Sequence, residues 1–157
     1  MSNAMEQLYQ QLIIDHAKAP HGKGLEQEYD AESFQVNPTC GYEVRLRVHL
    51  TAGEGGAPVV QVSWDGQGCS ISQASVSVMS ELVTGHPVAE ADALGEEFRA
   101  LMHTRGEGLD EAAEDRLGDA TAFTGVSRYP ARIKCALLGW MALRDALVQA
   151  GAGKEDA

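Results

Sequence analysis

Three cysteines, Cys40, Cys69 and Cys135, are the residues of this chain best suited to chemistry. Their number is odd and nothing at the start of the chain resembles an export signal, so we expect reduced thiols rather than disulfides. A thiolate is both a nucleophile and a soft metal ligand. The wide spacing leaves two alternatives open at this point: one shared metal site, or three thiols buried separately as packing residues.

Cys69 lies at the start of a predicted helix. Gly66 and Gly68 before it predict a tight turn with a close approach of the backbone, and Ser70 with Gln73 has the spacing of a capping box. Apolar residues at helical spacing follow. Because the amide dipoles of a helix N-terminus favour an anion, we expect the pKa of the Cys69 thiol to be lowered.

Cys40 belongs to a predicted turn at residues 37–41 that leads into a strand. Apolar and polar side chains alternate from residue 42 to residue 50, which predicts a strand with one buried face. If this alternation extends back to Cys40, then Cys40 and Tyr42 share one face of the strand and Glu43 points to the other. Tyr42 is therefore the neighbour best placed to join whatever Cys40 binds.

Cys135 lies in the early turns of the last predicted helix, which opens at Tyr129-Pro130 with proline near its first position. Arg132 and Lys134 flank the thiol, and their positive charges would favour a thiolate. Each cysteine thus stands at the junction of two elements, where thiolates are exposed and stabilised.

The remaining patterns predict the elements that position these thiols. Strands are expected at 31–36, 42–50 and 60–64, and helices at 6–17, 70–83, 88–121 and from residue 130 onward. Strands in meander order followed by helices predict an α+β fold, with a small antiparallel three-stranded sheet and helices packed on one face. The acidic stretch at 110–119 is expected to be mostly a solvated face.

Composition and charge exclude several classes of protein. The formal net charge of −11 argues against nucleic acid and anionic membranes, since both require a basic face. No apolar run approaches the length of a membrane span. We expect residues 1–4 to be an expression-tag remnant, residues 5–149 to form a single domain and residues 150–157 to be a disordered tail. The expected location is the cytoplasm.

Three motifs together carry a resemblance to a known family. Residues 37–41 (Asn-Pro-Thr-Cys-Gly), 66–75 (Gly-Gln-Gly-Cys-Ser-Ile-Ser-Gln-Ala-Ser) and 129–136 (Tyr-Pro-Ala-Arg-Ile-Lys-Cys-Ala) resemble the SufU/IscU (NifU N-terminal-like) family of iron–sulfur assembly proteins, as does the opening at 15–20. The chain looks like the SufU branch, because Lys134 stands where scaffold-type IscU proteins have histidine. Extra residues around 110–120 fit the same branch.

The resemblance implies a zinc-dependent sulfur acceptor, a sulfurtransferase-like accessory protein of a cysteine desulfurase. Cys40, Cys69 and Cys135 would ligate zinc, and Cys40 would be released to accept the persulfide sulfur. Arg132 matches an arginine of the branch motif, with either a supporting role or the plain role of a solvated helix residue. The alternative is a scaffold on which the same three cysteines carry a transient [2Fe–2S] cluster for apo iron–sulfur proteins.

One residue departs from the family pattern. The family has aspartate two residues after the first cysteine as a fourth ligand, and this chain has Tyr42. A phenol with a pKa of about 10 is a poor zinc ligand at neutral pH. Three possibilities follow: a three-thiolate site with water, a ligand borrowed from elsewhere such as His16, or a site too weak to hold metal. His86 and His103 are less tied to the motifs. A third interpretation of the protein, besides the sulfur acceptor and the scaffold, is an interaction domain whose cysteines are only packing residues.

Overall fold

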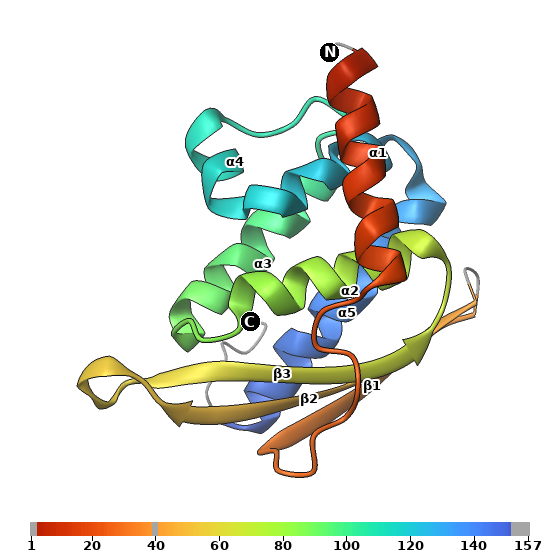
Figure 1. Ribbon diagram of the computed structural model, residues 1–157. Coiled ribbons are helices and arrows are strands. Elements are labelled where there is room, and N and C mark those ends of the chain that lie inside the picture. Colours follow the sequence, from red (N-terminus) through yellow and green to blue (C-terminus); the bar gives the residue numbers. More distant parts are fainter. Residues whose placement is uncertain (1–2, 39–40, 152–157) are drawn as a thin grey trace.

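A three-stranded antiparallel sheet forms one layer of the computed structural model, which describes residues 3–38 and 41–151. Strands β1 (Ala31–Asn37), β2 (Tyr42–Ala52) and β3 (Pro58–Gln67) pair in the order β1-β2-β3, and a short 3-10 turn, η1 (Glu54–Gly56), joins β2 to β3. Figure 1 shows the sheet beneath the helices. The predicted α+β class and the three-stranded meander are confirmed.

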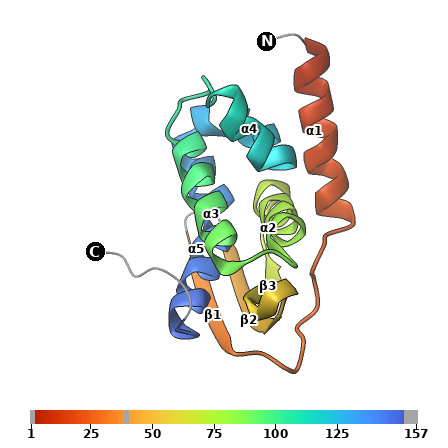
Figure 2. The ribbon, with the colours of Figure 1, turned by 90° about the vertical axis from the view of Figure 1, so that its left-hand side faces the viewer.

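The helical elements all lie on one side of this sheet, as the view along its edge shows (Figure 2). They are α1 (Asn3–Lys18), α2 (Ser70–Val83), α3 (Val88–Met102), α4 (Glu111–Leu117), the 3-10 segment η2 (Gly118–Arg128) and α5 (Pro130–Gln149). Helix α5 packs on β1 and β2, helix α2 packs beside it against β3, and α1 packs on α2. The prediction that helices cover one face is confirmed.

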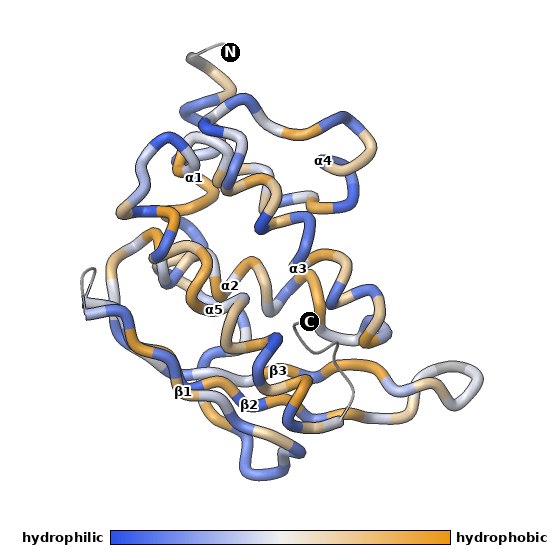
Figure 3. The backbone as a smooth tube through the Cα atoms, turned by 180° about the vertical axis from the view of Figure 1, so that it is seen from behind, coloured by the Kyte–Doolittle hydropathy of each residue, from blue (hydrophilic) through white to orange (hydrophobic). Residues whose placement is uncertain are grey.

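Alternation in β2 explains why only one face of the sheet is covered. Val44, Leu46 and Val48 are fully buried beneath the helices, and each such side chain contributes about 1.5–3 kcal/mol to folding. Arg45 and Arg47 point to the open face, where both bind Glu32 of β1 at 2.7 and 2.6 Å. The hydropathy of the backbone trace alternates along these strands in the same way (Figure 3).

Helix α2 is enclosed between α1, α5 and the sheet, so it buries polar as well as apolar residues. Ser72, Ser75, Ser77 and Ser80 are all buried, and their hydroxyls bond to backbone or side-chain groups. Small residues also bring α2 and α5 close together. A Cβ on Gly139 of α5 would lie 2.9 Å from Val76 Cβ, so only glycine fits at this crossing.

Two local predictions before α2 are wrong. Gly66 is not in a turn: β3 continues to Gln67, and glycine is needed at 66 because a Cβ there would meet the backbone of Glu43 and Val44 in β2. The capping box is also absent, since the N-cap is Cys69 and not Ser70. The Gln73 side chain reaches past the cap and donates to the Gly66 carbonyl at 3.3 Å.

The acidic region after α2 is helical only in part. Residues 103–110 separate α3 from α4, and Gly106 and Gly108 in this link have positive φ angles of 89° and 82°, which a helix does not accept. Ala113 and Leu117 of α4 are buried, so the stretch expected to be solvated contributes to the core.

The predicted domain limits remain predictions. Helix α1 begins at Asn3, inside the stretch predicted to be a tag remnant, and residues 152–157 of the predicted tail lie outside the described residues. Within the described part of the chain, none of the helices has both the length and the apolar character that crossing a bilayer requires.

Candidate functional site

Two of the three cysteines meet at one end of the helical layer. Cys69 is the N-cap of α2, and Cys135 lies in the second turn of α5. The Cys135 thiol is in hydrogen-bond contact with the Cys69 sulfur and also has the Ala131 carbonyl as an acceptor at 3.6 Å. Cys135 is 2% exposed, whereas Cys69 is partly open to solvent. The fold therefore joins two thiols that are far apart in the sequence, one buried and one accessible.

The crossing of α2 and α5 holds these two thiols in place. The Ser75 hydroxyl donates to the Ala136 carbonyl at 2.6 Å. Ala136 directly follows Cys135, and Ser75 lies in the second turn after Cys69. This bond is buried and joins the second turns of both helices. A buried hydroxyl without an acceptor costs about 1–3 kcal/mol, so the bond fixes the register of α2 against α5.

The surroundings of the Cys69 sulfur favour the thiolate. Partial burial raises the pKa of this thiol, but hydrogen bonds from the backbone N–H and hydroxyl of Ser72, the Ile71 N–H and the Cys135 thiol outweigh burial. The pKa of Cys69 therefore lies below its ordinary value, as the position at a helix start predicts. The Ser72 hydroxyl also donates to the Cys69 carbonyl at 2.9 Å, and its single hydrogen serves one acceptor at a time.

Tyr42 is buried against the backbone just before Cys69, and it lies on the buried face that the strand alternation predicts. Its side chain is 1% exposed, and a Cβ on Gly68 would lie 2.5 Å from the ring carbon Cδ1. The ring therefore packs on the backbone just before Cys69. Glu43 is exposed on the other side of the strand. At the position where the resemblance implies a carboxylate ligand, this chain places a buried aromatic ring in the core.

Cys40 and Thr39 lie outside the described residues, so the position of Cys40 remains a prediction. The residue after it, Gly41, is exposed and has a φ of +65°, the left-handed conformation that glycine adopts without strain. Asn37 and Tyr42 pair across the β1–β2 connection that contains Cys40.

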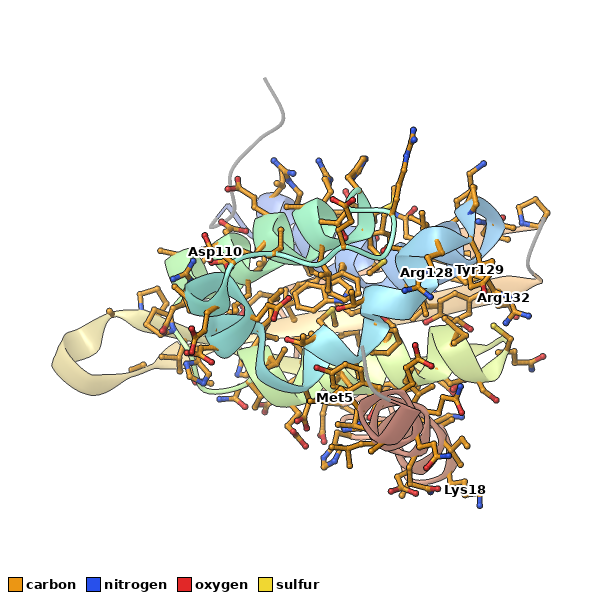
Figure 4. All side chains as sticks on the ribbon, turned by 90° about the horizontal axis from the view of Figure 1, so that it is seen from above. Met5, Lys18, Asp110, Arg128, Tyr129 and Arg132 are labelled. Carbon is orange, nitrogen blue, oxygen red and sulfur yellow. The ribbon has the colours of Figure 1, made fainter. Side chains whose placement is uncertain are left out.

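Basic and aromatic side chains gather where η2 ends and α5 begins. Arg128, Tyr129 and Arg132 lie together at this end of the molecule (Figure 4). They line a hollow of about 410 Å³ between α1, α2, η2 and α5, whose apolar wall includes Ile13 and Ile71. Arg132 is exposed and lies one turn before Cys135, so it is accessible to a partner that approaches the thiols.

The histidines lie elsewhere. The His16 ring nitrogen Nδ1 is 2.7 Å from the Ser77 hydroxyl, and Ser77 is eight residues, about 12 Å of helix, beyond Cys69. The structure thus places His16 away from the described thiols. His86 is exposed and lies 3.3 Å from Glu90, and His103 is exposed with its Nδ1 2.8 Å from the Arg99 carbonyl.

The residues around the thiols that the sequence did not single out are Ser72 and Ser75. Both lie in the motif at 66–75, but their roles depend on which helix crosses α2. The signal available was the recurrence of serine in an otherwise apolar helix. A buried hydroxyl needs a partner, so such serines mark hydrogen bonds to neighbouring elements.

Known proteins are similar to this chain over most of its length. The family model of the NifU-like N terminal domain matches residues 8–136. The chain is 38% identical over 152 residues to the zinc-dependent sulfurtransferase SufU of Bacillus subtilis (strain 168), covering 97% of this chain and 94% of the relative. It is 35% identical over 144 residues to the iron-sulfur cluster assembly scaffold protein IscU of Streptococcus pyogenes serotype M1, covering 91% and 84%.

A solved structure shares the fold. The crystal structure of the N-terminal part of a nitrogen-fixing NifU-like protein from Brucella abortus superposes with a TM-score of 0.77. The match covers 94% of this chain and 96% of that chain, at 24% sequence identity.

Proposed function

This chain belongs to the family of NifU-like N-terminal domains, the SufU/IscU proteins of iron–sulfur cluster assembly, and we propose that it accepts sulfur from a cysteine desulfurase at a zinc-binding thiol site. The observation that carries the proposal is the contact between Cys69 and Cys135, with the Cys69 pKa lowered. A cysteine that only packs has no need of several hydrogen bonds to its sulfur at a helix start.

Within the family, two features favour the SufU branch. Lys134 precedes the third cysteine, where the scaffold branch has histidine, and it is exposed. The chain also folds the extra segment before α5 into α4 and η2, which bury Leu117 and Phe123. The identities of 38% and 35% to the two named relatives differ too little to decide between them, so the branch rests on these residues.

The thiol donors fit zinc, and Tyr42 does not. Cys69 with its lowered pKa and Cys135 in contact with it form a soft pair of donors, and Cys40 would supply the third. Zinc, when bound, holds thiols as thiolates without redox chemistry of its own. The Tyr42 ring packs on Gly68, and its phenol would have to lose a proton to become a ligand. We therefore propose three thiolates with water as the fourth ligand.

The reacting group in this proposal is the Cys40 thiolate. It attacks the outer sulfur of the desulfurase persulfide, a sulfur–sulfur bond forms at Cys40, and the desulfurase cysteine leaves as a thiolate. The bond broken and the bond formed are of the same kind, so no external oxidant or reductant is needed. Arg132, which is exposed and lines the hollow, offers a positive charge to the incoming partner.

A sulfur-transfer assay with a cognate cysteine desulfurase tests this function. Wild type should stimulate the desulfurase and acquire a persulfide on Cys40, and the Cys40→Ser variant should do neither. The Glu43→Gln variant is the control, because Glu43 is exposed on the other side of β2. Stimulation that survives Cys40→Ser refutes the acceptor role.

The similarity to IscU supports a second candidate, a scaffold on which a [2Fe–2S] cluster is built on the same three cysteines before transfer to apo iron–sulfur proteins. The two candidates differ in a simple observable. A colourless protein that contains zinc supports the acceptor, and a brown protein after anaerobic reconstitution with iron and sulfide supports the scaffold. A cytoplasmic location fits either candidate.

A further inference from the structure

A second group of metal-ligating side chains lies away from the thiols. His16 of α1, His21 of the segment after α1 and Glu81 of α2 each offer one ligand atom, and these atoms all lie within 4.8 Å of one another. The His21 Nε2 is 3.0 Å from the Glu81 carboxylate, and the His16 and His21 rings are 5.1 Å apart. We propose that these residues bind a divalent first-row transition-metal ion in a site of nitrogen and oxygen ligands.

The backbone places His21 against this cluster. Its N–H donates to the Ser77 hydroxyl at 2.8 Å, and its carbonyl accepts from the Trp64 indole Nε1 at 2.7 Å. The next residue, Gly22, has a φ of +77° and packs so tightly on α2 that a Cβ would lie 3.0 Å from Ser80. The segment after α1 is thus fixed by contacts on three sides. A histidine that only faces solvent would not need its backbone to be fixed in this way.

His16 has the surroundings of a metal ligand. It is 8% exposed, and its Nδ1 is 2.7 Å from the Ser77 hydroxyl. A histidine that binds metal through one ring nitrogen almost always has a hydrogen-bond partner on the other, and Ser77 supplies that partner here. The Nε2 faces the Asp119 carboxylate of η2 at 3.9 Å, which provides a second acidic group at the edge of the site.

The donor set selects the class of ion. Two imidazoles and one carboxylate suit zinc and iron(II), whereas calcium and magnesium prefer oxygen ligands alone. Ligand bonds of about 2.0–2.2 Å require the donors to close by roughly 1 Å. His21 and Glu81 have side chains 53% and 42% exposed, so they are free to rotate inward around the buried His16. A bound ion would join α1, α2 and the segment between α1 and β1.

Cobalt(II) distinguishes this site from the thiol site in the full-length protein. Cobalt bound by thiolates gives an intense sulfur-to-metal charge-transfer band, and cobalt bound by nitrogen and oxygen does not. The experiment counts bound cobalt by equilibrium dialysis and records this band for wild type, His21→Ala and Glu81→Gln. His86→Ala is the matched control, because His86 and Glu90 form a similarly exposed pair, 50% and 59%, and among the described residues this pair is not part of a group of three metal-ligating side chains.

We expect wild type to bind one equivalent of cobalt that adds nothing to the charge-transfer band. His21→Ala and Glu81→Gln should each lower the affinity for this cobalt ion at least tenfold and leave the charge-transfer band unchanged. His86→Ala should bind cobalt as wild type does. Equal cobalt binding in wild type, His21→Ala and Glu81→Gln overturns the proposal, as does an equal loss in His86→Ala. A missing charge-transfer band would count against the thiol site and leave this proposal standing.

Discussion

Replacing Tyr42 by aspartate separates two roles of this position, core packing and metal binding. The Tyr42 side chain is 1% exposed and packs on Gly68. A buried aromatic side chain removes about 150–250 Å² from water, which at about 25 cal/mol per Å² corresponds to roughly 4–6 kcal/mol. Domains of this size are stable by only about 5–15 kcal/mol. We therefore expect metal-free Tyr42→Asp to lose from about a quarter to all of its free energy of unfolding.

Zinc should reverse this loss. The carboxylate restores the fourth ligand of the family pattern, and structural zinc sites contribute roughly 10–16 kcal/mol in favourable cases. This exceeds the packing loss of about 4–6 kcal/mol, so zinc-loaded Tyr42→Asp should be folded and should gain more from zinc than wild type gains. The wild-type protein, whose core Tyr42 fills, should remain folded after zinc is chelated.

Urea unfolding followed by the fluorescence of Trp64 and Trp140, both buried, measures these differences with and without zinc. Tyr42→Phe is the matched control: it keeps the ring, so its metal-free stability should stay within about 1 kcal/mol of wild type. Two results would refute the reasoning. Metal-free Tyr42→Asp as stable as wild type would mean that the ring does not support the core. An equal zinc response in both proteins would mean that residue 42 does not reach the metal.

Three further substitutions test the surroundings of the thiols. Ser72→Ala should raise the pKa of Cys69, so the pH midpoint for alkylation of the Cys69 peptide by iodoacetamide, measured by mass spectrometry across a pH series, should move upward; an unchanged midpoint contradicts the assignment. Gly68→Ala should force a methyl group against the Tyr42 ring and lower stability in urea by about 1–3 kcal/mol, so a neutral effect would argue against that contact. Arg132→Ala should change the free energy of unfolding by less than about 0.5 kcal/mol and reduce desulfurase-dependent sulfur transfer, and normal transfer would assign Arg132 to the solvated surface.

The sequence predicts those features that depend on local periodicity. The alternation at Val44, Leu46 and Val48 identifies the buried face of β2, and the same alternation places Tyr42 on that face. The lowered pKa of Cys69 follows from its position at a helix start. These properties depend on neighbours a few residues away, which the sequence displays directly.

Other features depend on which elements cross each other, and the periodicity of the sequence does not predict these crossings. The contact between Cys69 and Cys135 requires the close approach of α2 and α5 at Gly139. Gly66 looks like a turn residue in the sequence because glycine is common in turns, but the requirement at this position is the passage of the neighbouring strand. The meeting of His16 and His21 with Glu81 likewise depends on how α1 packs on α2.

Zinc-edge X-ray absorption fine structure tests most directly whether one ion is held by three cysteine thiolates. The His21→Ala variant, loaded with one equivalent of zinc, keeps the histidine cluster from contributing to the signal. We predict three sulfur neighbours at about 2.3 Å with one lighter neighbour, and two sulfur neighbours after the additional change Cys69→Ser. A first shell of nitrogen and oxygen alone, or a sulfur count unchanged by Cys69→Ser, would contradict the account.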